Sequence, residues 1–422
     1  MMPVPQLARV ISLVSLVLSV SSSVLPQLRR ETDMDASRAP IVRKSAAQPA
    51  AVARLLVGGG PTGLIGVAEF DGSSFEIVAN NTDAGTSASW QLFREGSNQL
   101  YAVDENSDTT RLFNIDAASN QITHVQDAQG SAGVVCLAFN QDRTRMAGAA
   151  YGAGALDFWD VSAPDGSLNL IKSISVPNDT GPNPEQDGPH PHQVLLDPTG
   201  RFFVAPDLGT DRILVVDTLD DSFEITNSLK VPQAGSGPRH AVFYPPGAPQ
   251  ATHYILLCET MNLIEVFEVE YAGNTINFTP AQELSSFGAD FPPANPSTAA
   301  AGEIQISPDG KDVYVSNRLT GDATDSVAHF GVVVSADDGS ITLQFRDTVS
   351  SGGILPRMFS FGRDGFEDYV FSVNQQGGDA LVAFRKADDG SLAPQPVASL
   401  PLSAFADPKS SNGPQFVQQI PI

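Results

Sequence analysis

Charged and imidazole side chains recur at two kinds of position in this chain: the start of a short apolar run, and the end of the apolar run that follows. The starts of the short runs carry His190, His192, Arg239, His240, Glu303 and Arg357. The ends of the following runs carry Asp104, Glu105, Tyr151, Asp207, Glu259, Asn317, Arg318 and Asn374. Histidines and carboxylates transfer protons, and the arginine fork binds carboxylate in a bidentate way. The set therefore indicates acid–base chemistry on an anionic ligand.

Some of these residues also have a purely structural interpretation. Asp207 and Asp211 flank Leu-Gly-Thr and suit the capping of a turn. Asp104 and Glu105 could be ordinary acidic residues of a turn. One histidine of the HPH segment 190–192 could be a buried structural residue. Arg239, Glu259 and Arg318 fit such roles less well, because a mixed-charge cluster in a narrow channel is costly to desolvate unless it is paired or occupied.

An internal repeat of roughly 45–60 residues predicts how these positions meet. Seven copies of a two-strand pattern lie at 54–71, 100–116, 146–161, 202–217, 254–269, 313–334 and 369–386. A shorter strand precedes each later copy, at 87–93, 133–139, 191–197, 238–244, 302–307 and 356–362. The first copy lacks one, and the seventh candidate lies at 414–420. The C-terminal strand is therefore predicted to close the first blade and remove the open edge of a ring.

The predicted fold is an all-β, seven-bladed β-propeller with four antiparallel strands in each blade and the short strand innermost. An array of β-sandwiches explains the seven-fold count and the split first blade less well. In a propeller, the innermost strand starts at the face where the antiparallel second strand ends. The unusual residues above must then converge around one mouth of the central channel.

The composition limits the function classes. The net charge of −24 repels a polyanion, so nucleic acid is not an expected partner. The chain has two cysteines, Cys136 and Cys258, which the repeat places two blades apart. We expect both to be buried free thiols. A closed ring without a free edge is expected to be a monomer.

The N-terminus has the pattern of a secretory signal. Arg9 precedes an apolar run at 10–20 that is too short to span a bilayer. We expect residues 1–23 to be a signal peptide, 24–50 a disordered or processed segment, and 51–422 one propeller domain. The sequons at Asn80, Asn178 and Asn277 are glycosylation candidates. We expect a secreted, extracellular protein that has no membrane association once its signal peptide is removed.

The ordered set of motifs resembles the lactonase family of seven-bladed propellers, which includes 6-phosphogluconolactonases and fungal carboxymuconate cyclases. The resemblance runs from about residue 54 to the C-terminus. Its most specific pieces are HPHQVLLDPTGRFFVAPDLGTDRILVVD, GSGPRHAVFYP, the glutamate of YILLCETMNLIEVF, and ISPDGKDVYVSNR, with support from LPRMFSF and VFSVNQ.

The resemblance implies a channel site that uses no metal or other cofactor. It places the family's acid–base and anion-holding roles on His192, Arg239, Glu259 and Arg318, with His190 competing for the first. The other mouth residues predicted to contact substrate are His190, Asp207, His240, Arg357 and Asn374. The sequence departs from the family at Ala150, where the family has an asparagine, and in the extra residues after Arg318.

Three hypotheses follow for the function. The first is a secreted lactonase or cycloisomerase that acts on a small anionic lactone or dicarboxylate. The second is a non-catalytic extracellular binding propeller, which Ala150 and the altered loop favour. The third is a metal-dependent lactonase that uses histidines and carboxylates as ligands. No GxSxG segment of a serine hydrolase is present.

Overall fold

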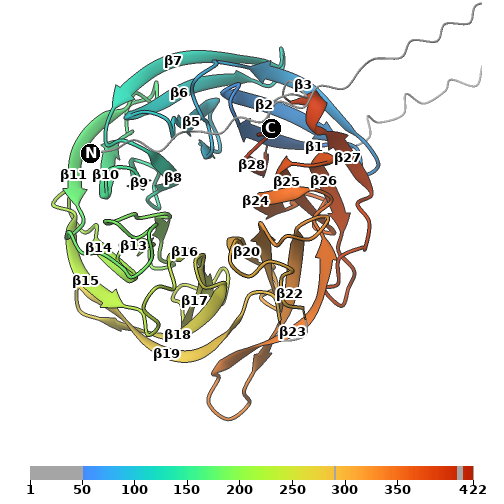
Figure 1. Ribbon diagram of the computed structural model, residues 1–422. Coiled ribbons are helices and arrows are strands. Elements are labelled where there is room, and N and C mark those ends of the chain that lie inside the picture. The colour runs from blue at the N-terminus through green and yellow to red at the C-terminus, as the bar shows by residue number, and fades with distance from the viewer. Residues whose placement is uncertain (1–50, 289–290, 406–411, 422) are drawn as a thin grey trace, which may run out of the picture. The chain divides into compact units, whose positions relative to one another are not determined.

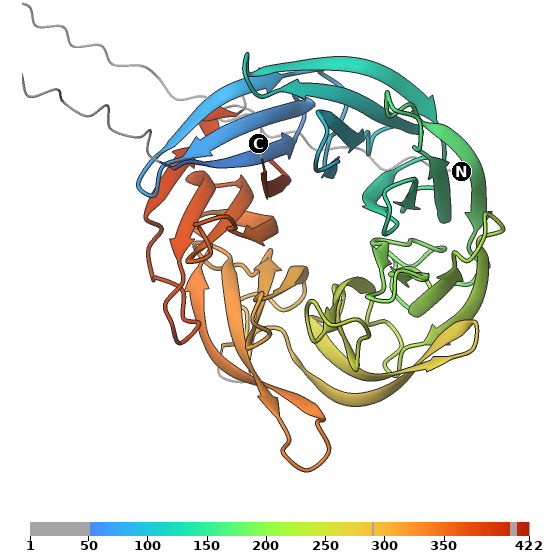
Figure 2. The same ribbon diagram turned by 180° about the vertical axis from the view of Figure 1, so that it is seen from behind.

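The computed structural model describes residues 51–288, 291–405 and 412–421, which form one compact ring of seven antiparallel sheets (Figure 1). Each sheet contains four strands and radiates from the central axis, and the view from behind shows the same arrangement (Figure 2). The seven-bladed propeller predicted from the repeat is confirmed. The signal peptide expected at 1–23 and the segment 24–50 lie outside the described residues.

The blades are numbered in chain order, and their strands are given from the axis outward. Blade 1 contains β28 Phe416–Ile420, β1 Ala53–Gly59, β2 Leu64–Phe70 and β3 Phe75–Asn81. Blades 2 and 3 contain β4 Gln91–Phe93, β5 Gln99–Val103, β6 Thr109–Asp116 and β7 Gln121–Gln129, then β8 Val134–Phe139, β9 Arg145–Ala150, β10 Ala155–Asp160 and β11 Asn169–Ser175. Blades 4 and 5 contain β12 Leu195–Leu196, β13 Phe202–Asp207, β14 Arg212–Asp217 and β15 Glu224–Lys230, then β16 Pro238–Tyr244, β17 His253–Cys258, β18 Leu263–Ala272 and β19 Thr275–Ser285. Blades 6 and 7 contain β20 Ala300–Ile306, β21 Asp312–Arg318, β22 Ser326–Val334 and β23 Ile341–Ser350, then β24 Ile354–Phe361, β25 Tyr369–Gln376, β26 Asp379–Arg385 and β27 Ala398–Pro401, followed by a short 3-10 helix, η1 Leu402–Ala404.

The second and third strands of each blade form the core. In blade 4, every residue of β13 is buried, whereas β15 at the rim is half-buried to exposed along its length. Adjacent blades cover both faces of the middle strands, so these strands are continuous apolar runs without alternation.

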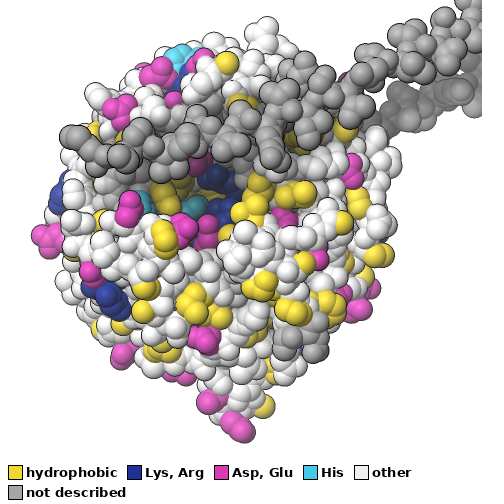
Figure 3. Space-filling view, in the orientation of Figure 1, with side chains coloured by type: hydrophobic (Ala, Val, Ile, Leu, Met, Phe, Trp, Pro, Cys, Tyr) yellow, Lys and Arg dark blue, Asp and Glu magenta, His cyan; other side chains and the backbone are white. Residues whose placement is uncertain are grey.

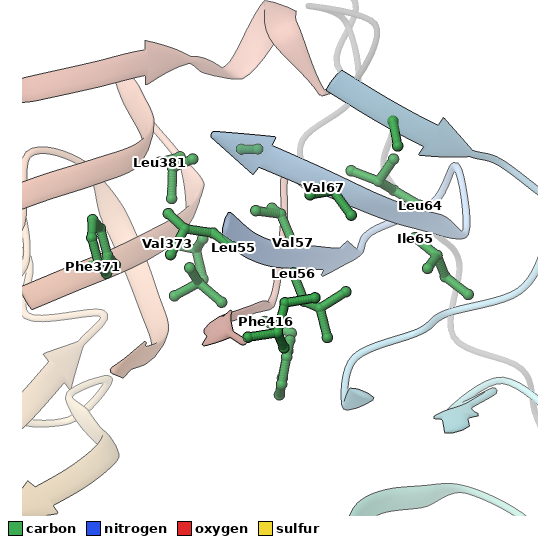
Figure 4. Packing of buried hydrophobic residues seen from close by; sticks show 14 of the residues in the cluster. Leu55, Leu56, Val57, Leu64, Ile65, Val67, Phe371, Val373, Leu381 and Phe416 are labelled. Atoms are coloured by element: carbon green, nitrogen blue, oxygen red, sulfur yellow. The ribbon is translucent and has the colours of Figure 1, made fainter. Parts of the chain in front are cut away.

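The C-terminal strand closes the ring as predicted. β28 pairs antiparallel with β1, with Phe416 opposite Gly58 and Ile420 opposite Arg54. Phe416 lies beside the side chains of β1, in a cluster that extends to blade 7 (Figure 4). The two ends of the described chain are therefore joined within a single sheet.

The innermost strands are irregular near their starts. Register shifts fall between Val134 and Cys136, Pro238 and His240, Ala301 and Ile304, and Pro356 and Met358. A β-bulge leaves an extra residue out of the ladder and re-aims its side chain. Arg239, Glu303 and Arg357 lie in these bulges, so the bulges determine which polar groups face the axis.

Two innermost strands are shorter than predicted. The sequence indicated strands at 87–93 and 191–197, but only Gln91–Phe93 and Leu195–Leu196 are strands. Near the mouth, side-chain acceptors replace ladder bonds, as where the Ser87 amide donates to Asp104 Oδ1 at 2.8 Å. The two cysteines are buried and free, as expected, in blades 3 and 5.

A buried carboxyl group without hydrogen-bond partners lies outside the channel in blade 5. Glu265 is 2% exposed on β18, opposite Glu283 on β19. Neither of its carboxylate oxygens has a hydrogen-bond partner among the described residues. Burial, together with the charges of Glu283 and Asp211, raises the pKa of Glu265 to about 7.

We expect the Glu265 carboxyl to cost the folded protein stability as the pH rises from about 5 to 8. The folded-state pKa of Glu265 lies above its unfolded value, so the folded state holds the extra proton in this window and must give it up. Glu265→Gln should remove this loss and stabilise the protein at pH 8 by about 1–3 kcal/mol. Urea unfolding at pH 5 and pH 8 measures the effect, with the exposed Glu224→Gln as control. The same pH dependence in both variants would contradict the assignment.

Candidate functional site

Two arginines converge on one carboxylate at the mouth of the channel. Arg239 Nε and Arg318 Nη2 lie 2.6 Å and 2.9 Å from the same oxygen, Glu259 Oε2. Arg239 is the bulged residue of β16, Glu259 directly follows β17, and Arg318 ends β21. The Glu259 backbone is held on both sides, because its amide donates to the Gly237 carbonyl and its carbonyl accepts from the Ala301 amide.

The ionisation of this cluster leaves one excess positive charge. Burial alone would raise the pKa of Glu259, but Arg318 and Arg239 outweigh it and hold the pKa below its ordinary value. Burial and the neighbouring Arg318 lower the pKa of Arg239 to about 10, so Arg239 remains a cation at neutral pH. Two guanidinium groups and one carboxylate thus attract an anion locally, in a protein whose net charge is −24.

The bulge of β20 supplies the backbone partners of both arginines. The Gly302 carbonyl accepts from Arg239 Nη1, and the Ala301 carbonyl accepts from Arg318 Nη2 at 2.9 Å. A Cβ at position 302 would lie 2.6 Å from Ser316 Oγ and 3.2 Å from Arg318 Cδ. Glycine at 302 therefore lets β20 lie close to Ser316, and it also leaves space for the Arg318 side chain.

Two histidines and a buried glutamate form a hydrogen-bonded chain next to this cluster. His192 Nδ1 lies 3.2 Å from His240 Nε2, and His240 Nδ1 lies 2.8 Å from Glu303 Oε2. Burial is the main cause that holds the pKa of His192 well below its ordinary value, and the Arg239 charge adds to it. Burial also lowers the pKa of His240, despite the opposing charge of Glu303. Both imidazoles are therefore neutral at neutral pH.

A second ion pair completes the mouth. Arg357 Nη2 of blade 7 lies 2.9 Å from Glu105 Oε2 of blade 2. Burial would raise the pKa of Glu105, but Arg357 outweighs it and the pKa is lowered. This pair bridges two blades that flank blade 1 on either side.

A small cavity of about 10 Å³ lies among these groups, which is space for one water molecule. Its lining residues are Ser89, Trp90, Val135, His192, Arg239, His240, Glu303, Arg357, Met358 and Gln415. Trp90 of blade 2 contacts the ring of His240 in blade 5, with 5.8 Å between ring centroids. Trp90 also borders a larger, mainly apolar cavity lined by later residues of the innermost strands, so Trp90 and Met358 lie between the polar and the apolar cavity.

The structure distinguishes the two histidines of the HPH segment. Both ring nitrogens of His190 have protein partners, the Tyr151 carbonyl at 2.8 Å and Asp187 Oδ1 at 2.9 Å. The His190 ring also stacks on Tyr151, with 4.3 Å between centroids. His192 borders the cavity, whereas His190 does not. The geometry therefore favours His192 for chemistry and gives His190 a supporting position.

Two residues predicted to contact substrate lie behind the channel surface. Asp207 is 0% exposed and accepts from the His190 amide, the Gly209 amide and Thr210 Oγ1, so it caps its turn. Asn374 is also 0% exposed, and its Nδ2 donates to the Ser351 and Asp379 carbonyls. The prediction placed both at the mouth because it assumed that all second strands end there alike, but these two side chains turn into their blades.

The space-filling view shows Lys or Arg and His side chains gathered in the central hollow, with carboxylates around it (Figure 3). Sequence reasoning placed Glu303 at the mouth without a role and did not single out Trp90. The presence of a tryptophan within the predicted first strand of a blade was the signal that could have identified Trp90.

The sequon residues Asn80, Asn178 and Asn277 are all exposed.

Among residues 51–288, 291–405 and 412–421, no group of three or more histidines, cysteines and carboxylates has the arrangement of a metal site. The HPH pair does not offer two free ring nitrogens to one ion, since His190 is bonded at both and His192 at Nδ1. No helix in this part of the chain is long and apolar enough to cross a membrane.

A seven-bladed ring with arginines, a carboxylate and histidines gathered at one channel mouth defines a class of propeller with a polar axial site. Residues 54–399 match the family described as "Lactonase, 7-bladed beta-propeller". The chain therefore belongs to the lactonase family of seven-bladed propellers.

Individual relatives agree with this assignment. The chain is 34% identical over 251 residues to a protein of Arthroderma benhamiae named "Probable 6-phosphogluconolactonase", an alignment that spans 58% of this chain and 61% of that relative. It is 27% identical over 296 residues to the 6-phosphogluconolactonase of Bacillus subtilis, covering 69% of this chain and 78% of the relative. The solved periplasmic gluconolactonase of Pseudomonas aeruginosa has the same fold, with a TM-score of 0.71 at 20% identity over 88% of this chain and 99% of that chain.

Proposed function

We propose that the axial site binds a small anionic lactone and catalyses its hydrolysis, or its formation in the reverse direction. The observation that carries the proposal is the pair of arginines on Glu259 Oε2, which leaves excess positive charge beside a neutral histidine and a cavity of one-water size. The two named 6-phosphogluconolactonases support a sugar lactone as the substrate class.

A lactone is an internal ester, so its hydrolysis needs an activated water and a partner for the developing oxyanion. His192 is neutral and borders the cavity, so its ring can accept a proton from water, but burial and the Arg239 charge make it a weaker base than a free imidazole. Arg239 and Arg318 hold the substrate's anionic group or the oxyanion. Glu259 is ionised and fixes both guanidinium groups, which suits an orienting role better than proton donation.

Cyclisation of a muconate-type dicarboxylate is a different reaction that the same groups could serve. The arginines would hold one carboxylate while the other adds to one carbon of the double bond, and the adjacent carbon would take a proton that His192 first accepts from solvent. The same groups therefore serve a lactonase and a cycloisomerase, and the choice depends on the ligand.

Turnover of a panel of lactones tests the proposal. The panel should contain 6-phosphogluconolactone, gluconolactone and a carboxylated muconolactone, each followed by acid release and with a chelator present. We expect turnover of at least one anionic member and weaker turnover of the uncharged one. Binding of anionic members without turnover would favour the non-catalytic binding propeller, and the absence of both would overturn the proposal.

We further propose that the protein is secreted and glycosylated. The exposure of Asn80, Asn178 and Asn277 supports this proposal, together with the apolar N-terminal run. Expression in the source cells should give protein that lacks residues 1–23 and whose mass falls on glycosidase treatment. N-terminal sequencing that finds Met1 on a cytosolic, unglycosylated protein would contradict it.

A further inference from the structure

We propose that Glu303 and His240 are positioning residues that fix the tautomer of His192, so that His192 presents Nε2 as a proton acceptor. The inference rests on the proposed function for its catalytic meaning, but not for its structural content. It assigns to two buried residues a role that their positions at the mouth alone do not indicate.

The direction of the chain follows from its end. A carboxylate can only accept a hydrogen bond. In the contact between Glu303 Oε2 and His240 Nδ1, the proton must therefore lie on His240 Nδ1. A neutral imidazole with its proton on Nδ1 has a lone pair on Nε2, which must then accept from His192 Nδ1. The remaining nitrogen of His192, Nε2, carries the second lone pair.

The position of each member is firmly fixed. Glu303 is 0% exposed, its other oxygen accepts from Gln305 Nε2 at 2.9 Å, and its amide donates to Ser316 Oγ at 2.8 Å. The ring of Trp90 meets the His240 ring edge-on, and Tyr151 meets the His192 ring in the same way at 5.6 Å. These contacts oppose rotation of either imidazole.

The orientation matters because the opposite tautomer would be a donor. A His192 with its proton on Nε2 would donate a hydrogen bond to a water in the cavity and could not take its proton. Among the described residues, His192 Nε2 has no hydrogen-bond partner of its own, so it is the nitrogen left for a ligand. The charged groups that act on His192 are Arg239, Arg318, Arg357 and, through His240, Glu303. The Glu303 carboxylate therefore opposes three cations and supports the proton acceptor.

The tautomers are measured directly by two-bond ¹H–¹⁵N correlation spectra of the histidine rings in the full-length protein, with His192→Gln and His240→Gln for assignment. The chain has six histidines, so the spectrum is tractable. We expect the proton on Nδ1 and a bare Nε2 for both His192 and His240. Glu303→Gln should give mixed tautomers, because an amide can turn either its oxygen or its NH₂ to His240 Nδ1. A wild-type His192 protonated on Nε2 would overturn the inference.

Steady-state kinetics on a lactone that the wild-type protein hydrolyses provide a second test. Glu303→Gln should lower kcat about 10- to 100-fold with KM nearly unchanged, because it acts on proton transfer and not on anion binding. His240→Gln retains an oxygen that can accept from His192 Nδ1, so it should keep more activity than His240→Leu. The control is Glu265→Gln, the same substitution at a buried carboxyl group of blade 5 outside the channel. We expect its kcat to equal that of the wild type. Equal kcat in Glu303→Gln and the control would contradict the positioning role.

The two proposals fail separately. If wild-type protein turns over no lactone, the proposed function fails, while the spectra still decide whether Glu303 sets the tautomer. If turnover is normal but His192 carries its proton on Nε2, only the positioning role of Glu303 and His240 fails.

Discussion

Deletion of residues 412–422 is expected to destroy the cooperative fold of the whole ring. β28 is the innermost strand of blade 1, and its loss exposes β1 and the side chains of Leu55 and Val57, which belong to the same buried cluster as Phe416. Removal of one buried phenylalanine costs about 3–5 kcal/mol. Loss of Phe416, Val417 and Ile420 with all their ladder bonds therefore approaches the total stability of a typical domain, about 5–15 kcal/mol.

Urea unfolding and circular dichroism measure this effect, and two substitutions calibrate it. Phe416→Ala should lower the free energy of unfolding by about 3–5 kcal/mol. Gln418→Ala, at the exposed position of the same strand, should change it by less than about 0.5 kcal/mol. A truncated protein with the melting temperature of the intact one would show that ring closure does not hold the fold together.

If the proposed lactone hydrolysis is correct, Arg239→Ala is expected to have the largest effect on it. It removes one of the two guanidinium groups on Glu259 and leaves the Gly302 carbonyl without its arginine partner. Loss of one partner of a buried charge pair costs about 2–5 kcal/mol, so kcat/KM should fall by roughly 30- to several-thousand-fold. Because Arg239 is 1% exposed, the melting temperature should be measured alongside the kinetics.

Two further variants separate charge from geometry. Arg239→Lys keeps the cation but lacks the planar fork that reaches Glu259 and Gly302 together, so its activity should be intermediate. Arg145→Ala removes an arginine paired with Asp221 and Asp160 away from the channel and should leave kcat/KM unchanged. An Arg239→Ala protein with wild-type kcat/KM would exclude this residue from the site.

The repeat made the architecture predictable from the sequence. Each blade needs four strands, the first copy lacked one, and the C-terminal segment 414–420 supplied it, as the β28–β1 pairing confirms. The convergence of Arg239, Glu259 and Arg318 also followed from antiparallel topology, since strand starts and ends alternate between faces in any such blade.

The finer geometry could not be predicted, because it depends on bulges. Arg239 and His240 are neighbours in sequence, and strict alternation would send them to opposite sides; the bulge at Arg239 lets both line the same cavity. Asp207 ends β13 at a position equivalent to that of Glu259 after β17. The Asp207 carboxylate, however, accepts hydrogen bonds from residues of its own turn and does not face the channel. A pattern of period two carries no information on such local turns.

The central claim is that the arginine pair at the channel mouth binds the anionic group of a lactone or of its hydrolysis product. A crystal structure of the full chain with a bound aldonate product, such as 6-phosphogluconate, tests it most directly. We predict an anionic group of the ligand within hydrogen-bond distance of Arg239 or Arg318, with the carboxyl carbon that derives from the lactone near His192. A ligand bound elsewhere on the propeller, with the Arg239–Glu259–Arg318 cluster unoccupied at saturating concentration, would contradict the account.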